Sequence, residues 1–462
     1  MATPYFGNST TKIPKSGENS IDALLLPRKW GRKFGQGATI TYSFPDQNSA
    51  WSSVYTDDSI TAMEPYDAEF RAMLPGERVM FRKALKTWEE VANIKFEEVA
   101  DGGSKAGEIR IALSGVVTGN FAGWAYGPWS QPYGGDIWLS PTYFDRAFDK
   151  GEGSGQYLTL LHEIGHALGL AHPFEGKHQL PTETDSYAYT VMSYTDHPSA
   201  SIYPTTPMVY DIAALQYIYG ANTETRKGNT TYKFSSSEEV VESIWDAGGT
   251  DVIDVSNQRL PTFVDLRGGR LSSIGRTNLG DRATNNVGVA FGANIENAIG
   301  SRFQDHLTGN NLKNRLVGGD GGDYLLGHRG RDRLIGGRGG DVLQGGRGKD
   351  FLNGGKGGDV YQYTNTNQGS DVIKSFKRGQ GDKLSFSKSQ FGGLRNGKLV
   401  NKRFVANTTG LASDADQRFV FNTTSNTLLY DADGSGAQAA VTIATFRNDA
   451  NLRAKDIIIG TA

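Results

Sequence analysis

Hydrophobic residues in the first 220 positions follow two different periods. Alternation of apolar and polar residues predicts β-strands at 39–43, 94–99, 108–113, 121–126 and 135–139. Apolar residues at helical spacing predict helices at 17–26, 75–91, 156–169 and 209–219. Helices and strands that are interspersed in this way indicate a mixed α+β domain.

The pattern changes after Gly220. Helical periodicity ends there, and short β-type runs alternate with Gly, Asp and Asn turns up to about residue 300. The polar, patternless stretch 221–232 predicts a domain boundary. We therefore expect one domain at 18–222 and an all-β domain at 223–462, with residues 1–17 forming a propeptide or a flexible N-terminus.

Residues 300–362 carry an uninterrupted repeat of nine residues. The seven copies are GSRFQDHLT, GNNLKNRLV, GGDGGDYLL, GHRGRDRLI, GGRGGDVLQ, GGRGKDFLN and GGKGGDVYQ. Position one is always Gly, position six is Asp except for Asn314, and position eight is Leu except for Tyr361. This period is the signature of a parallel β-roll that binds calcium. A flexible glycine-rich linker is the alternative, but a linker needs no register.

Each repeat predicts a short strand and a six-residue turn, so that two repeats complete one coil. Leu at position eight points inward, and Asp at position six supplies a hard oxygen for Ca²⁺ beside turn carbonyls. The predicted ligands are Gly318, Asp323, Gly327, Asp332, Gly336, Asp341, Gly345, Asp350, Gly354 and Asp359. Asp323 should stack on Asp341, and Asp332 on Asp350. Because stacked carboxylates repel one another without the ion, folding of this domain should depend on calcium.

The first two copies of the repeat are irregular. Phe303 and Leu312 replace the fourth-position Gly, and Asn314 replaces Asp. Terminal copies often act as caps, so these two are less suited to ions. Arg or Lys fills many variable positions of the repeats, and the sequence suggests only solvated charge balance for them.

Composition adds several exclusions. The net charge of −2 and pI near 6.4 give no electrostatic reason to expect nucleic acid or an anionic membrane as partner. Cysteine is absent, which excludes disulfides and thiolate metal sites. No apolar run is long enough to span a bilayer, so stable membrane insertion is not expected. The N-terminus lacks the apolar segment of a secretory signal, so an export address is expected elsewhere or as a removed segment.

Residues 162–172 read His-Glu-Ile-Gly-His-Ala-Leu-Gly-Leu-Ala-His. On a helix, His162 and His166 share a face and can bind one ion, with Glu163 beside it as a base for a metal-bound water. Gly169 can end the helix in the left-handed conformation and bring His172 in as a third nitrogen. Three neutral imidazoles leave a position open for water, as a catalytic zinc site requires.

The alternatives for these residues are ordinary ones. A bare HExxH can be a chance helix with surface histidines, but the longer HExxHxxGxxH is far more specific. The histidines outside this spacing are expected to be ordinary polar residues: His178, His197, His306 and His328. Taken alone, Met192 would be an ordinary residue of the hydrophobic core. Because it follows the zinc motif, the segment Val191-Met192-Ser193-Tyr194 looks like the Met-turn of the metzincins.

These motifs resemble those of the serralysins, bacterial secreted metzincin proteases with a C-terminal calcium β-roll. The resemblance covers nearly the whole chain. It includes HEIGHALGLAHP (162–173), DSYAYTVMSYT (185–195), DIAALQYIYGAN (211–222), SIWDAGGTDVIDVS (243–256), NIENAIG (294–300) and the repeats.

The resemblance implies an α+β metzincin-type catalytic domain followed by an all-β parallel β-roll. It implies one zinc ion held by His162, His166 and His172, with Glu163 as general base. Tyr194 is implied as a fifth zinc ligand that moves to the oxyanion, and Met192 as the hydrophobic floor under the metal. The strand at 121–126 is implied to pair with extended peptide, so specificity should be broad.

Several calcium ions are implied as well. Arg226, Gly228 and Thr230 match one site at the junction of the domains, which Asp246, Gly248 and Asp251 complete. Gly249 and Glu296 match a neighbouring site, where Asn294 replaces the usual threonine of the family. The loop 429–439 contains Asp431 and Asp433, which suit either another calcium or a surface turn.

The implied partners are protein and peptide substrates and the type I secretion machinery, and the implied location is extracellular. The tail Lys455-Asp456-Ile457-Ile458-Ile459 fits the export signal of the family, although Gly460-Thr461-Ala462 follow it. We expect a monomer. The alternatives are a calcium-dependent adhesin or surface-layer protein with a weak zinc site, and a zinc hydrolase that acts on something other than peptides.

Overall fold

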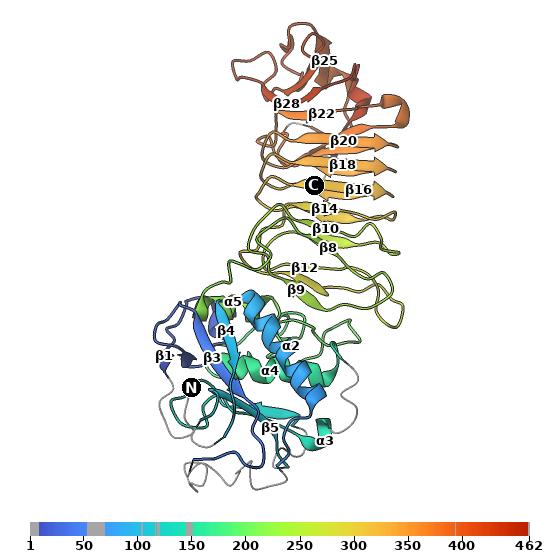
Figure 1. Ribbon diagram of the computed structural model, residues 1–462. Helices are drawn as coiled ribbons and strands as arrows, with labels where there is room; N and C mark the ends of the chain where they lie inside the picture. The colour runs from blue at the N-terminus through green and yellow to red at the C-terminus, as the bar shows by residue number, and fades with distance from the viewer. Residues whose placement is uncertain are drawn as a thin grey trace.

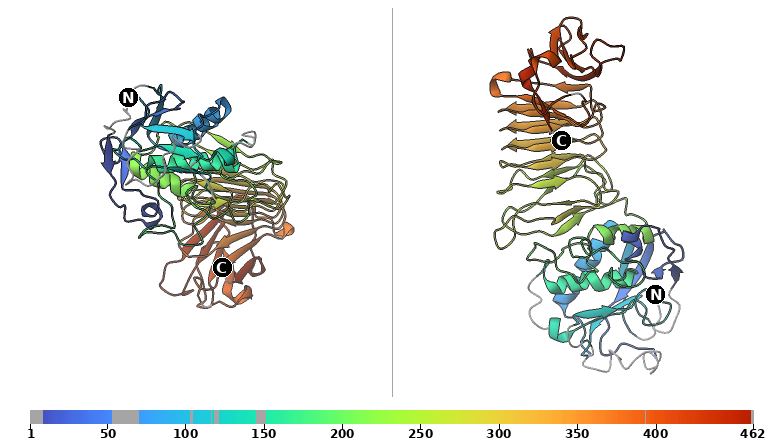
Figure 2. Two further views of the ribbon diagram at one scale, coloured as in Figure 1. Left: turned by 90° about the horizontal axis from the view of Figure 1, so that it is seen from below. Right: turned by 180° about the vertical axis from the view of Figure 1, so that it is seen from behind.

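The computed structural model describes residues 9–52, 70–102, 105–115, 117, 121–144, 151–392 and 394–460. It shows a unit of helices around a sheet, with a tall stack of strands on one end of it (Figure 1). The right-hand view of Figure 2 shows the same arrangement from behind. The first eight residues of the predicted propeptide and the last two of the tail lie outside the described residues.

The first unit is built on a five-stranded sheet of order β4-β3-β5-β7-β6. Its strands are β3 (Ala38–Ser43), β4 (Ile94–Glu98), β5 (Ile109–Leu113), β6 (Gly123–Ala125) and β7 (Ile137–Leu139). The edge strand β6 is antiparallel to β7, while the other pairs are parallel. Sheet-type hydrogen bonds extend past β6 to Ala122 and Tyr126, as the predicted strand at 121–126 requires.

Among the described residues of this unit, the helices lie where the sequence predicts them, except the short helix at Pro141–Phe144, which was not predicted. They are α1 (Asn19–Asp22), α2 (Pro75–Val91), α3 (Pro141–Phe144), α4 (Gly155–Leu168) and α5 (Val209–Tyr219). The helix predicted at 17–26 is shorter, because Leu24 and Leu26 hydrogen-bond to Ala171 and Gly169 instead of continuing α1. Residues 10–12 form β1 (Thr10–Lys12), which pairs with β2 (Arg28–Trp30).

The repeats form a two-sheet parallel roll. One face belongs to an eleven-stranded sheet with β8 (Thr231–Lys233), β10 (Val252–Asp254), β14 (Asn297–Ile299), β16 (Arg315–Asp320), β18 (Arg333–Arg338), β20 (Phe351–Lys356) and β22 (Asp371–Ile373). The other belongs to an eight-stranded sheet with β11 (Phe263–Asp265), β15 (His306–Thr308), β17 (Tyr324–Leu326), β19 (Val342–Gln344), β21 (Val360–Tyr363) and β23 (Lys383–Ser387).

Residues two repeats apart lie side by side in this roll. Leu316 pairs with Leu334, which pairs with Leu352, and all three are fully buried. The inward-pointing position eight and the two-repeat coil are therefore confirmed. Strands β16, β18 and β20 are longer than predicted, because each continues through the first three residues of the following turn.

The C-terminal residues close the roll. They form β24 (Gly397–Lys398), β25 (Phe404–Asn407), β26 (Phe419–Asn422), β27 (Thr427–Tyr430), β28 (Val441–Phe446) and β29 (Ile457–Gly460), with 3₁₀ turns at 378–380, 401–403 and 454–456. The predicted export tail is a folded strand, since β29 lies between β23 and β24 with Ile457 and Ile459 buried.

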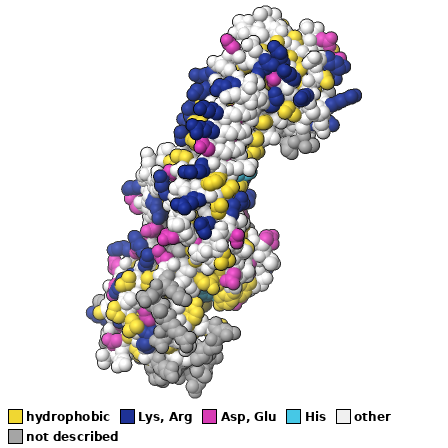
Figure 3. Space-filling view, turned by 90° about the vertical axis from the view of Figure 1, so that its right-hand side faces the viewer, with side chains coloured by type: hydrophobic (Ala, Val, Ile, Leu, Met, Phe, Trp, Pro, Cys, Tyr) yellow, Lys and Arg dark blue, Asp and Glu magenta, His cyan; other side chains and the backbone are white. Residues whose placement is uncertain are grey.

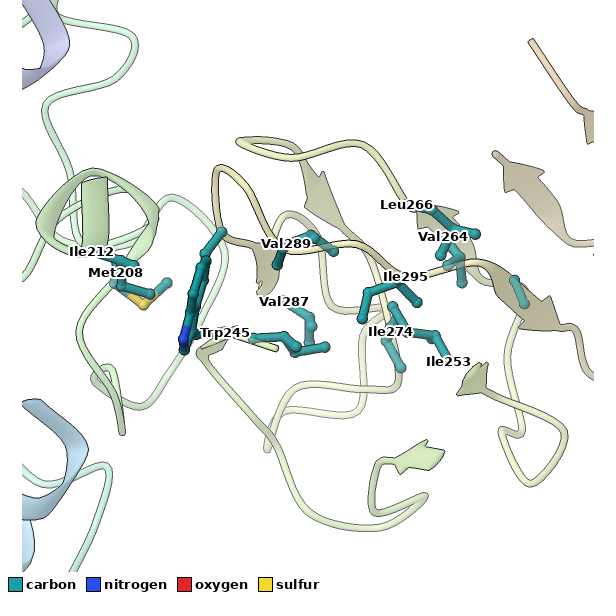
Figure 4. Packing of buried hydrophobic residues seen from close by; sticks show 14 of the residues in the cluster. Met208, Ile212, Trp245, Ile253, Val264, Leu266, Ile274, Val287, Val289 and Ile295 are labelled. Carbon is teal, nitrogen blue, oxygen red and sulfur yellow. The ribbon is translucent and has the colours of Figure 1, made fainter. Parts of the chain in front are cut away.

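The two parts share one hydrophobic core. A small sheet of β9 (Glu242–Ile244), β12 (Leu271–Ser272) and β13 (Val287–Val289) lies at the junction. Trp245 lies between Met208 and Ile212 of the first unit and Val287 and Val289 of the second (Figure 4). Its indole N–H donates to the carbonyl of Asn222 (2.9 Å), in the predicted linker. Among the described residues, no helix has the length and apolar character that crossing a bilayer requires.

Candidate active site and metal centres

Helix α4 places the first two histidines. Ser154 caps its N-terminus by accepting from the backbone N–H of Tyr157 (3.2 Å). Gly169 ends it with a left-handed φ of 108°, and the Leu170 N–H returns to the carbonyl of Gly165 (2.9 Å). This turn brings His172 back to the helix, as the spacing predicts.

The three imidazoles converge through one nitrogen each. His172 Nε2 lies 3.2 Å from His162 Nε2 and 3.0 Å from His166 Nε2. Each Nδ1 faces an acceptor: the Val191 carbonyl (2.8 Å), the Leu170 carbonyl (2.8 Å) and Glu175 Oε1 (3.1 Å) respectively for His162, His166 and His172. With the proton on each Nδ1, three lone pairs face one another, and this arrangement fits a shared cation.

Burial keeps the first two rings neutral. It lowers the pKa of His162 to about 4 and the pKa of His166 well below its ordinary value. Neutral imidazole is the form that binds zinc, and three nitrogen ligands leave a position open. In the part of the chain that the structure describes, these histidines are the one cluster of His, Cys, Asp or Glu with ligand geometry.

Glu163 lies beside this cluster without joining it. The residue is 4 % exposed, and its Oε2 is buried without a hydrogen-bond partner. Burial raises the pKa of this carboxyl to about 8. Glu163 lines a cleft of about 450 Å³ together with Gly123 of β6, His162 and Tyr194. An unpartnered buried carboxyl next to a metal-type site is typical of a proton-transfer group.

Tyr194 lies beside the three histidines, and Met192 lies against helix α4. The Tyr194 hydroxyl lies 3.0 Å from His172 Nε2, and the residue is 59 % exposed, so it has room to move. Met192 is fully buried. A Cβ on Gly165 would lie 2.5 Å from the Met192 sulfur, so helix α4 needs glycine there.

Sequence reasoning assigned no role to Asp211, which holds this turn in place. Its carboxylate accepts from the Thr190 hydroxyl (2.5 Å) and from the N–H groups of Val191 and Met208 (2.8 Å each). It thereby joins the Met-turn to the start of α5. Burial raises the pKa of Asp211 to about 7. An acidic residue in the first turn of a helix was the available signal, but its burial was not visible in the sequence.

The repeat aspartates form two ladders. In each, one carboxylate oxygen accepts from the backbone N–H of the residue one coil earlier, as from Asp323 to Asp341 Oδ1 (2.9 Å) and from Asp332 to Asp350 Oδ1 (2.8 Å). The other oxygen is buried without a partner in Asp323, Asp332, Asp341, Asp350 and Asp359. A hard cation fits such oxygens.

The first-position glycines lie against the same oxygens. A Cβ on Gly336 would be 2.1 Å from Asp341 Oδ2 and 2.6 Å from the carbonyl of Gly354. The same pair of oxygens crowds Gly318 and Gly327, while the aspartate side chain alone crowds Gly345 and Gly354. Carboxylate and carbonyl oxygens therefore share a small space that only glycine leaves open.

The first two repeats, which the sequence marks as irregular, differ from the others in the hydrogen bonding of their position-six side chains. Both carboxylate oxygens of Asp305 already accept from Thr262 and Ser301. The side chain of Asn314 is likewise satisfied, by Asn310 and the carbonyl of Glu296. These side chains need no ion.

Sequence reasoning missed two members of the ladders. Asp371 accepts from the N–H of Asp350 (2.9 Å), and Asp382 from the N–H of Asp359 (3.1 Å). The Oδ2 atom of Asp371 is also buried without a partner. Their spacings fall outside the nine-residue period, so the repeat alone does not reveal them.

The junction residues also come together. Asp251 accepts from the Thr230 N–H (2.7 Å), and its own N–H donates to Glu296 (2.8 Å). Asp251 Oδ2 is buried without a partner, and burial raises the pKa of this carboxyl to about 6. A Cβ on Gly249 would lie 2.6 Å from the carbonyl of Gly228.

Asp246 and Arg226 complete this region. Asp246 accepts from the N–H of Gly248 (2.9 Å), and its negative charge contributes to the raised pKa of Asp251. The Arg226 side chain donates to the Trp245 carbonyl (3.1 Å). A guanidinium cation has no free lone pair, so only the main-chain carbonyl of Arg226 is a possible calcium ligand.

Comparison with known proteins identifies the class. Residues 73–220 match the family model described as Matrixin, a peptidase domain, and residues 210–459 match Peptidase M10 serralysin C terminal. The fold and the three-histidine site thus define a metallopeptidase joined to a β-roll.

Individual relatives agree. The chain is 33% identical to serralysin of Proteus mirabilis over 67% of its own length and 68% of the relative. It is 31% identical to metallopeptidase AprA of Pseudomonas marginalis (60% and 61%) and 35% identical to serralysin A of Dickeya chrysanthemi (59% of each). The matches thus span about two thirds of the first relative and about three fifths of the others. The chain belongs to the serralysin family of metalloendopeptidases.

Proposed function

We propose that this protein is a secreted zinc endopeptidase of broad specificity, with Glu163 as general base. The observation that carries the proposal is the unpartnered Oε2 of Glu163, buried in the cleft beside three converging imidazole nitrogens. Bound by His162, His166 and His172, zinc supplies the Lewis acidity that lowers the pKa of a water and polarises a peptide carbonyl.

The chain's own residues supply the remaining steps. Glu163 accepts a proton from the attacking water and returns it to the nitrogen of the leaving amine. A divalent cation nearby favours the carboxylate form, which offsets the effect of burial on the pKa of Glu163. Tyr194 donates its hydroxyl proton in a hydrogen bond to the oxygen on which negative charge develops.

The edge strand β6 supports broad specificity. Gly123 of β6 and the preceding Phe121 and Ala122 line the cleft, and among the described residues β6 pairs with β7 alone. An extended peptide can add to the free side through main-chain hydrogen bonds, which are the same for every sequence. The substrates are therefore internal peptide bonds of proteins.

The β-roll is proposed to hold several calcium ions. The buried, unpartnered oxygens of the Asp ladders and of Asp251 support this role. The junction site would use Arg226, Gly228 and Thr230 through carbonyls. Because β29 is a buried strand, the tail can meet the type I secretion machinery only before the roll folds. The folded protein is proposed to act outside the cell as a monomer.

Casein cleavage by the purified protein and by Glu163→Ala tests the mechanism, with bound zinc measured in both. We expect cleavage by the first and none by the second, with zinc retained. Equal cleavage would exclude Glu163 as the base. Absence of cleavage by either protein would favour the adhesin or surface-layer alternative.

A further inference from the structure

The outside of the β-roll is strongly basic, although the whole chain is nearly neutral. Residues 300–383 contain 14 Lys and Arg and 9 Asp, and no Glu. Eight of those Asp are buried in the ladders or beside them, and only Asp320 is exposed. Lys and Arg side chains accordingly predominate on the roll in Figure 3. Bound calcium would offset the buried carboxylates and leave the exterior positive.

The positive charge is densest where the second, fourth and sixth repeats turn, which we call the even-turn edge. Lys313, Arg331 and Lys349 occupy position five of these turns and are 18 residues apart, one above another. Arg329 and Arg347 occupy position three and are paired in register. Arg315 and Arg333 occupy position seven and are also paired. All seven residues are exposed.

These side chains repel one another without compensation. Adjacent coils lie ~4.8 Å apart, and like charges directly opposite across strands are destabilising. Within the described part of the chain, none of the seven forms an ion pair. Arg333 is instead held over the ring of Phe351 (4.4 Å). Solubility alone is better served by mixed signs, so an edge of one sign indicates a polyanionic partner.

A polar groove runs beside the position-three column. It has a volume of about 230 Å³ and is lined by Arg329, Arg347, His328 and the amides of Asn311, Gln344 and Gln368. The Gln344 amide is bonded to Tyr324 and Thr364, and Gln368 Oε1 accepts from Thr364, so Asn311 and the Gln368 NH₂ group are the amide groups offered to hydroxyls. Arginine binds carboxylate or sulfate in a bidentate manner. The groove therefore combines the donors and acceptors that suit a sugar carrying a negative charge.

We propose that the even-turn edge binds a linear acidic polysaccharide, with charged groups on the cation columns and sugar hydroxyls in the amide groove. Nucleic acid fits less well, because single strands stack on exposed aromatic rings and this groove has amides instead. The opposite edge of the roll fits less well too. Its column of Arg338 and Lys356 includes the exposed Asp320, 3.9 Å from Arg338.

Two quadruple variants test the proposal in full-length, calcium-loaded protein carrying Glu163→Ala to prevent self-cleavage. The first carries Arg329→Gln, Arg331→Gln, Arg347→Gln and Lys349→Gln. The second removes the same charge elsewhere, by Arg338→Gln, Lys356→Gln, Lys374→Gln and Lys377→Gln. Binding to heparin, polygalacturonate and neutral dextran is measured at physiological salt, beside single-stranded and duplex DNA.

We expect heparin or polygalacturonate to bind the parent protein and dextran not to bind. The even-turn variant should bind at least about tenfold more weakly, and the second variant within about threefold of the parent. Equal weakening in both variants would show diffuse charge and overturn the proposal, as would absence of polysaccharide binding. Tighter binding of DNA than of either polysaccharide would replace it with a nucleic-acid partner. Circular dichroism during calcium titration, and casein cleavage by the same variants with Glu163 intact, check that folding and catalysis are unchanged.

Discussion

Replacing Gly336 with alanine tests whether the crowded oxygens of the roll are calcium ligands. The added Cβ would lie 2.1 Å from Asp341 Oδ2 and 2.6 Å from the Gly354 carbonyl. The φ of Gly336 lies outside the left-handed region, so alanine brings no backbone strain of its own. The change therefore acts on the Asp341 carboxylate and the Gly354 carbonyl.

The structure sets the size of the effect. Ordinary contact begins at 3.4 Å, so Asp341 Oδ2 must move by 3.4 − 2.1 = 1.3 Å. Calcium–oxygen distances lie within ~2.3–2.6 Å, and an oxygen displaced that far no longer coordinates. Disturbing a group that only supports a metal ligand costs ~10–100-fold in affinity, so at least this loss is expected. That factor corresponds to about 1.4–2.8 kcal/mol.

Gly340 in the same repeat provides the control. A Cβ there would meet only the Gly358 carbonyl, at 3.2 Å. Both substitutions restrict the unfolded chain equally, so their difference isolates the contact. The assay is calcium titration followed by circular dichroism, in protein carrying Glu163→Ala. A calcium midpoint for Gly336→Ala equal to that for Gly340→Ala would refute the assignment of these oxygens.

Three further predictions concern stability. Leu334→Ala should lower the free energy of unfolding of the calcium-loaded protein by about 2–5 kcal/mol in urea, because Leu334 is fully buried between Leu316 and Leu352; a loss below about 1 kcal/mol would contradict this. Burial raises the pKa of Asp211 to about 7 from 3.8, so the folded state keeps a proton that the unfolded state releases, and stability falls as pH rises from about 4 to about 7. Asp211→Asn should remove this fall, which amounts to roughly 4 kcal/mol, whereas parallel stability–pH curves for the two proteins would exclude it. Removal of calcium should melt the roll strands in circular dichroism, while selective removal of zinc should stop catalysis alone; unfolding on loss of zinc would contradict this division.

Much of the fold follows from local patterns. The helix predicted over 75–91 has those bounds, because Pro75 starts it and the Glu77 carboxylate accepts from the Leu74 N–H (2.7 Å). The helix at 17–26 could not be placed as well. Its apolar residues serve instead to pair with the chain after Gly169, a contact between segments far apart in the sequence.

The catalytic site also has a part that local sequence patterns predict and a part that they do not. Ligand spacing within one helix and its turn predicts where His162, His166 and His172 meet. The position of Asp211 depends on α5 returning to the Met-turn, which no local period encodes. The continuous core around Trp245 likewise joins segments that the sequence assigns to separate domains.

The aspartate ladders explain why the β-roll continues beyond the last nine-residue repeat. Each position-six residue has a backbone N–H that is buried inside a turn and needs an acceptor. The Asp of the next coil provides this acceptor. Every further coil therefore needs such an Asp, whatever the length of the loop between the coils. Asp371 and Asp382 satisfy it for Asp350 and Asp359 at separations of 21 and 23 residues, although the nine-residue period has ended. In the ladder aspartates from Asp323 to Asp371, one oxygen is thus fixed by the backbone and the other is free for an ion. Asp382 differs, because its second oxygen accepts from the Lys377 N–H (2.7 Å).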